Sequence, residues 1–219
     1  MQRSVARGRT MVFEDPPAIR ALFGDSRWAW LWLAVRVYVG YSWLNSGLGK
    51  LGNPAWTETG SSLRGYWTNA INLPAQGSPP ITFGWYRDFI ATLLAGGHYT
   101  WFAKLIVAGE LLIGTALILG AFVGIAALFG GFMNWNFMMA GTSSVNPVLF
   151  VLSVLLILAW KNAGYYGLDR WLLPALGTPW HRGEIFSHGS MAEEVHRDDA
   201  LRKERERPLR EDQEGQNVA

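Results

Sequence analysis

The amino-acid sequence predicts an all-α fold: a bundle of four transmembrane helices, the first two joined by a long extracytoplasmic loop. Fifty consecutive residues, from Leu111 to Trp160, include no Asp, Glu, Lys or Arg, whereas a water-soluble helix needs a polar face. One span takes about 20 residues, so this run must fold back on itself. The 12 tryptophans also favour a membrane protein, because several flank the predicted spans, where amphipathic rings prefer the interface.

Four apolar segments fit such spans: residues 28–48, 101–119, 122–140 and 147–160. The first contains one charge, Arg36, and the second contains Lys104 and Glu110. Glycines after the first and second segments, and the loop "GTSSVNP" before the fourth, supply turns. Pro147 suits the first turn of the fourth helix, which "KNAGYY" can extend.

The loop of residues 52–99 contains "FGWYRDFIATLLAGG" (83–97). Its apolar residues fall near one helical face, and Arg87 and Asp88 fall on another. This pattern predicts a short amphipathic helix that lies on the outer membrane surface or docks on the bundle. A structural lid and a role in guiding a ligand are both open interpretations.

Basic residues precede the first span and follow the last: Arg3, Arg7, Arg9, Arg20, Arg27, Lys161, Arg170 and Arg182. The positive-inside rule therefore predicts a multi-pass protein of the inner (plasma) membrane with both termini in the cytoplasm. The chain then divides into a cytoplasmic N-terminal segment (1–27), a membrane domain (28–176) and a charged cytoplasmic tail (177–219).

Composition excludes several kinds of chemistry. The chain has no cysteine, so it cannot form a disulfide, a cysteine-bound iron–sulfur cluster or a cysteine-ligated zinc site by itself. All 4 histidines lie outside the predicted spans, so we expect no haem and no metal site in the bundle. No basic patch with interleaved aromatic residues predicts binding to nucleic acid.

The charges inside the apolar segments need partners, because a charge at a helix centre costs at least ~2.5–3.5 kcal/mol on insertion scales. At 1.5 Å per residue, Arg36 lies roughly 12 Å and Glu110 roughly 14–18 Å from the cytoplasmic surface. The two are therefore predicted to form a buried ion pair. Such a pair can simply fix the register of two helices, or it can bind a polar ligand, for which a quinone is the leading candidate.

Two asparagines in the third segment, Asn134 and Asn136, complete this candidate ligand site. Because they are two positions apart, they cannot share a helical face, so we expect one to face the bundle core and the other an adjacent groove. Near the outer end of the first segment, Asn45, Ser46 and Lys50 stand at helical spacing and predict a second polar cluster. A candidate anion site combines cations at and beyond this end: Lys50, Arg64 and Arg87.

Four stretches show a family resemblance: "RVYVGYSWLNSGLGKL" (36–51), "GELLIGTALILG" (109–120), "MNWNFMMAGTSSVNP" (133–147) and "YYGLDRWLLP" (165–174). In this order they resemble the DoxX family, over roughly residues 28–176, and look most like its DoxD branch, the membrane subunit of thiosulfate:quinone oxidoreductase. The residues that match the polar positions of these motifs are Arg36, Lys50, Glu110, Asn134, Asn136 and Asp169. The resemblance implies a four-helix membrane protein, often one subunit of an oxidoreductase assembly with quinone as electron acceptor.

Two functional hypotheses follow. The chain can be the membrane subunit of a quinone-linked oxidoreductase, working with other subunits, with a sulfur compound such as thiosulfate as the candidate substrate. Alternatively, it can be a non-catalytic accessory subunit that binds quinone or lipid at the edge of a larger respiratory or photosynthetic complex. A small channel or carrier is less favoured, because the spans contain a single candidate charge pair.

Overall fold

The computed structural model describes residues 15–74 and 78–177. Within these ranges every regular element is a helix, which confirms the all-α fold. The chain divides into two compact units, Met1–Asp169 and Arg170–Ala219. Of the second unit, the structure describes only residues 170–177, most of which belong to helix α10 (Asp169–Ala175). The predicted charged tail therefore lies almost wholly outside the described residues.

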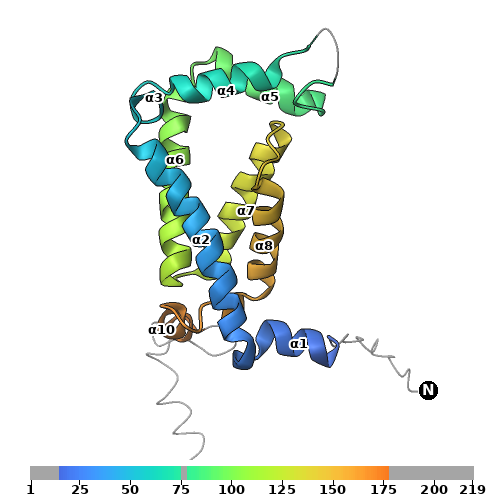
Figure 1. The fold of residues 1–219 in the computed structure, drawn as a ribbon, viewed down its shortest axis with the longest axis vertical. Coiled ribbons are helices and arrows are strands. Elements are labelled where there is room, and N and C mark those ends of the chain that lie inside the picture. The colour runs from blue at the N-terminus through green and yellow to red at the C-terminus, as the bar shows by residue number, and fades with distance from the viewer. Residues whose placement is uncertain (1–14, 75–77, 178–219) are drawn as a thin grey trace, which may run out of the picture. The chain divides into compact units, whose positions relative to one another are not determined.

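Four long helices form the body of the first unit: α2 (Ala29–Leu51), α6 (Tyr99–Leu119), α7 (Val123–Met139) and α8 (Asn146–Leu158). They agree closely with the four predicted segments. Figure 1 shows α2 running beside α6, and α7 beside α8. The predicted extension of the last helix is a separate turn, α9 (Trp160–Ala163), which begins after Ala159. At the N-terminal side, α1 (Pro17–Gly24) and the 3-10 turn η1 (Ser26–Trp28) lead into α2.

In the described part of the connection between α2 and α6 there are three helices, where the sequence predicted one. They are α3 (Pro54–Thr57), α4 (Ser61–Ile71) and α5 (Gly84–Ala95). Helix α5 is the predicted amphipathic helix, whereas α4 was missed although its buried residues Leu63, Trp67 and Ala70 follow the i, i+4, i+7 pattern of a helix. Helices α4 and α5 pack together over one end of α6 and α7 (Figure 1), around a buried cluster that includes Ile81, Ile106 and Ala140. We call this the α4–α5 end of the bundle.

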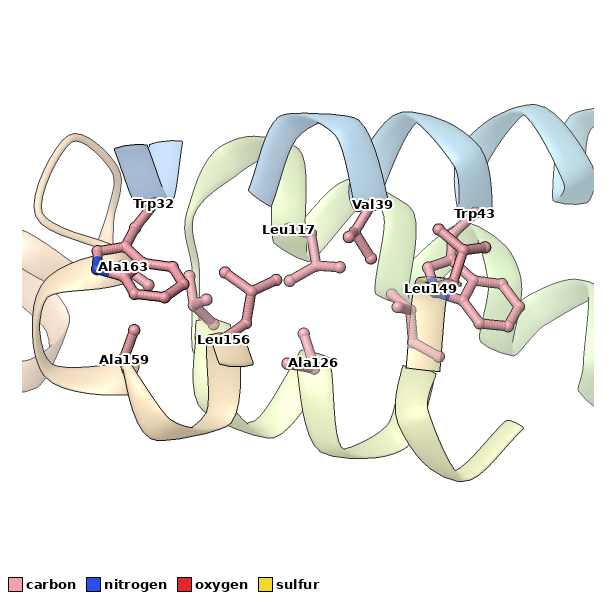
Figure 2. Close-up of a cluster of buried hydrophobic side chains, with 12 residues drawn as sticks. Trp32, Val39, Trp43, Leu117, Ala126, Leu149, Leu156, Ala159 and Ala163 are labelled. Carbon is pink, nitrogen blue, oxygen red and sulfur yellow. The ribbon is translucent and has the colours of Figure 1, made fainter. Parts of the chain in front are cut away.

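The core of the bundle is a cluster of apolar side chains from all four long helices (Figure 2). Val39 of α2 and Leu117 of α6 meet Leu156 of α8 at its centre, and all three are completely buried. Many small van der Waals attractions add up in such a close-packed cluster, so it favours packing of the four helices around one centre.

Glycines set the register of α2 against α6. A Cβ on Gly114 would stand 2.6 Å from the backbone nitrogen of Leu44, and one on Gly47 would stand 2.9 Å from the side chain of Leu111. Larger residues would push the helices apart, so these glycines allow the close approach that places Gly47 beside Leu111 and Gly114 beside Leu44.

Among the described residues, α6 is the one helix that is both long enough and apolar enough to cross a membrane by itself. Helices α7 and α8 are apolar but shorter, with 17 and 13 residues. Helix α2 has 23 residues, but polar groups such as Arg36 and Lys50 dilute its apolar character.

Candidate functional site

Arg36 and Glu110 are not partners, so the predicted ion pair is wrong. The glycine contacts place Glu110 near the last turns of α2, whereas Arg36 precedes Gly47 by about three turns, or roughly 16 Å along the axis. The depth estimate failed because it assumed that both helices end at one level. In the structure α2 begins beyond the C-terminal end of α6, so Arg36 lies level with that end.

Arg36 binds backbone carbonyls instead of a carboxylate. Its Nη1 donates to the oxygens of Leu117 (2.6 Å) and Ile118 (2.9 Å), and its Nη2 donates to the oxygen of Tyr166 (3.1 Å). The last carbonyls of a helix have no partner within the helix and form the negative end of its dipole. Arg36 is only 1% exposed, so it places its positive charge against the C-terminus of α6 inside the protein.

The segment after α9 satisfies the remaining carbonyls at this end. The N–H of Leu168 donates to Leu119 O (3.1 Å), and the N–H of Asp169 donates to Gly120 O (2.8 Å). Gly120 has a φ of 69°, and a Cβ there would collide with the Arg36 guanidinium. The tight turn between α6 and α7 therefore requires glycine at this position.

Asp169 binds the other side of the same turn. Its Oδ1 accepts from the N–H of Phe122 (2.6 Å) and its Oδ2 from the N–H of Val123 (2.9 Å), at the start of α7. Burial raises the pKa of Asp169, while these two amide donors and the Arg36 charge oppose the rise. Asp169 thus caps α7 as Arg36 caps α6. The sequence identified Asp169 only as a motif residue, because the cap comes from a distant segment.

Glu110 pairs with Lys50. The Lys50 Nζ lies 2.8 Å from both carboxylate oxygens, and the Ser46 hydroxyl donates to Oε1 at 3.2 Å. Glu110 is 1% exposed. The predicted polar cluster of Ser46 and Lys50 therefore forms with Glu110 as its third member, whereas Asn45 is exposed.

The expected anion site is not formed in the predicted way. Glu110 neutralises the charge of Lys50, whose Nζ also lies 5.3 Å from the ring centroid of Trp56. The guanidinium of Arg64 on α4 lies over the ring of Tyr99, 5.6 Å from its centroid. Arg87 belongs to a different helix, α5. An anion would have to compete with Glu110 for Lys50.

A groove of about 770 Å³ runs between α6 and α7 and meets α4 and α5 at one end. Its walls are apolar along most of its length: Leu105, Gly109, Leu112, Ala116, Phe122, Ile125, Phe129 and Phe132. This volume lies in the range of about 300–1,000 Å³ that is typical of small-molecule sites. The sequence predicted a groove beside one asparagine of the third segment, but not its walls or its volume, because these depend on how far α6 and α7 separate.

Polar and aromatic groups gather where the groove meets the α4–α5 end, at Tyr66, Tyr86, Trp135 and Asn136, which we call the tyrosine end. The Tyr86 hydroxyl lies 3.1 Å from Asn136 Oδ1, and the Tyr66 hydroxyl lies 2.7 Å from Thr142 Oγ1. Burial raises the pKa of Tyr86 to about 12 and also raises the pKa of Tyr66. Both phenols therefore remain neutral hydrogen-bonding groups at physiological pH.

The two asparagines of α7 face different surroundings, as their spacing of two predicted. Asn136 lines the groove, whereas Asn134 is completely buried and is not among the groove residues. The structure therefore separates the four residues of the predicted ligand site. Arg36 lies at the C-terminus of α6, Glu110 pairs with Lys50, Asn134 lies in the interior and Asn136 lines the groove.

Comparisons of the chain with protein-family models, with curated proteins and with solved structures give no match. The resemblance to the DoxX family thus stays a prediction from sequence motifs.

Replacing Arg36 with Gln removes the charge at the C-terminus of α6 and is expected to destabilise the bundle. A hydrogen bond to a charged group contributes roughly 1.5–3 kcal/mol, so we expect the free energy of unfolding to fall by at least about 1.5–3 kcal/mol. Unfolding by SDS in mixed micelles measures this change. The control is Arg27→Gln, because the Arg27 side chain is 79% exposed and pairs with Asp25 at the surface. Equal stability of the two variants would contradict a capping role for Arg36.

Proposed function

We propose that this chain is a multi-pass membrane protein in which α2, α6, α7 and α8 are four transmembrane helices. The distribution of side chains supports this proposal. Arg36, Glu110 and Asn134 are buried, while large apolar residues are exposed on the long helices: Leu105, Leu112, Leu119, Ile125, Leu128, Phe129, Phe132, Val148, Val151 and Leu158. Exposed apolar surface of this extent is typical of contact with lipid, and buried polar groups in membrane helices face the protein interior.

The basic flanks support an orientation with both termini in the cytoplasm of the inner membrane. Four spans then bring the chain back to its starting side. The α4–α5 end lies on the outer side, where α2 ends and α6 begins.

The groove supports binding of a lipophilic molecule that has a planar polar head and a long hydrocarbon chain, and a quinone is the leading candidate. From Phe122 to Asn136 it follows about 21 Å of α7, a length suited to an extended chain. At the tyrosine end, the rings of Phe132 and Trp135 lie 6.0 Å apart and those of Tyr86 and Trp135 lie 6.3 Å apart. Aromatic rings in such an array can stack on a planar head group.

The exposure of the groove suggests a route of entry. Leu112 is 70% exposed although it lines the groove. In a bilayer this open side would face lipid, so a ligand could enter laterally from the membrane without crossing water.

A quinone site of this kind suits the membrane subunit of a quinone-linked oxidoreductase, and the DoxX resemblance supports that assignment. The chain has no cysteine to hold an iron–sulfur cluster, and none of its histidines lies within α2, α6, α7 or α8 to bind haem. Electrons would therefore reach the quinone from a partner subunit or by direct contact with a donor. A sulfur compound such as thiosulfate is the candidate donor.

The pairing of groups at the tyrosine end favours a second candidate, an accessory subunit without catalysis. The hydroxyls of Tyr66 and Tyr86 already have partners within the chain, Thr142 and Asn136. A lipid acyl chain needs no hydrogen bond, so the groove can also hold lipid at the edge of a larger respiratory or photosynthetic complex.

The four-span arrangement predicts which loops a membrane-impermeant thiol reagent will label. Because the natural chain has no cysteine, single cysteines can be introduced without background. In intact cells we expect labelling of Thr59→Cys and Ser143→Cys, which lie outside, and none of Ser26→Cys until the membrane is opened. All three positions are exposed. Labelling of all three in intact cells would contradict the arrangement.

Filling the groove is expected to release its ligand. Leu112→Trp should reduce the quinone that co-purifies from native membranes about tenfold, which corresponds to ~1.4 kcal/mol, as measured by mass spectrometry. The matched control is Leu158→Trp on α8, where the residue is 57% exposed but does not line the groove. Glu110→Gln should keep the ligand, because Glu110 faces Lys50.

Each alternative gives its own result in that experiment. Loss of quinone from Glu110→Gln but not from Leu112→Trp would move the site to the charged pair. Release of a phospholipid rather than a quinone from Leu112→Trp would favour the accessory role. Equal ligand content in all variants would overturn the groove as a binding site.

A further inference from the structure

Three polar side chains inside the bundle have no hydrogen-bond partner among the described residues. They are Trp43 of α2, Asn134 of α7 and Ser153 of α8. Asn134 and Ser153 are completely buried and Trp43 nearly so. The unpaired atoms are both side-chain polar atoms of Asn134, the Nε1 of Trp43 and the Oγ of Ser153. Buried polar groups are nearly always hydrogen-bonded, so a group of unpaired atoms at one place indicates an additional component.

These side chains converge on one stretch of α7. A Cβ on Gly130 would stand 3.0 Å from Trp43 Nε1, and one on Gly131 would stand 3.4 Å from Ser153 Cβ. The rings of Trp43 and Phe137 lie 6.4 Å apart. Residues 130, 134 and 137 share one helical face, so Trp43 contacts the face of α7 that carries Asn134.

This interior position is distinct from the two sites described above. None of the three side chains lines the groove between α6 and α7. The Lys50–Glu110 pair lies nearby, since Ser46 follows Trp43 on α2 by about one helical turn, but its charges and the Ser46 hydroxyl bind one another.

We propose that Trp43, Asn134 and Ser153 bind one or two water molecules between α2, α7 and α8. The donor and acceptor pattern fits water: the Trp43 indole only donates, whereas the Asn134 amide and the Ser153 hydroxyl can both donate and accept. A buried water molecule typically makes about three hydrogen bonds, and these three side chains supply that number.

Other kinds of occupant fit less well. An apolar ligand would leave all the polar atoms unpaired. An ion would need a compensating charge, and none of the three side chains is charged. A neutral molecule that both donates and accepts is therefore required, and water is the one always present.

Solid-state NMR of the full chain in liposomes tests the proposal through transfer of magnetisation from water to protein. We expect transfer to the Asn134 side-chain amide and to the Trp43 indole N–H, and none to the completely buried Val39 and Leu156. Transfer to the exposed Thr59 is the positive control. Absence of transfer to both Asn134 and Trp43 would overturn the water site.

Variants test whether the three side chains share this water. In Asn134→Leu, transfer of magnetisation to the Trp43 indole should fall several-fold. The control is Ser42→Ala, which should leave this transfer unchanged, because Ser42 lies on α2 beside Trp43 but its hydroxyl bonds Tyr38 O. If Asn134→Leu does not fold, Ser153→Ala gives the same readout. Unchanged transfer at Trp43 in the folded variant would contradict a shared site.

Discussion

The packing of the bundle depends on two buried charged side chains that hydrogen-bond the free backbone groups at the turn between α6 and α7. Arg36 binds the last carbonyls of α6, and Asp169 binds the first amides of α7. Both groups are costly to bury alone, but each meets a helix end whose partial charge is opposite to its own. The turn is further closed by Gly120, where a side chain would displace Arg36. The start of α7 is thereby fixed relative to α6, and so is the groove between them.

The glycine contacts between α2 and α6 decide which polar groups meet. They bring Lys50, not Arg36, to the level of Glu110. As a result, the charged residues of the long helices that looked most like a ligand site largely satisfy one another or the backbone. The two faces of α7 then differ: Asn136 belongs to the apolar groove, and Asn134 belongs to the interior with Trp43 and Ser153. In the proposed site, ligand binding would depend on shape and aromatic contact rather than on buried charge.

Local patterns in the sequence were sufficient to predict the four long helices and α5, because apolar run length and periodicity depend only on neighbouring residues. Helix α4 could also have been found, since Leu63, Trp67 and Ala70 show the same periodicity. The partners of Arg36 and Glu110 could not be predicted from local patterns. They depend on the stagger of α2 against α6, which is set by Gly47 and Gly114. The cap by Asp169 and the walls of the groove likewise depend on contacts between distant segments.

The most direct test of the groove is photo-crosslinking with a quinone analogue that has a photoreactive group on its hydrocarbon chain, followed by mapping of the adducts by mass spectrometry. We expect adducts on the facing walls of the groove, at residues such as Ala116 of α6 and Ile125 and Phe129 of α7, and we expect excess natural quinone to suppress them. Adducts spread evenly over the exposed apolar faces of α2 and α8, unaffected by natural quinone, would contradict a specific site between α6 and α7.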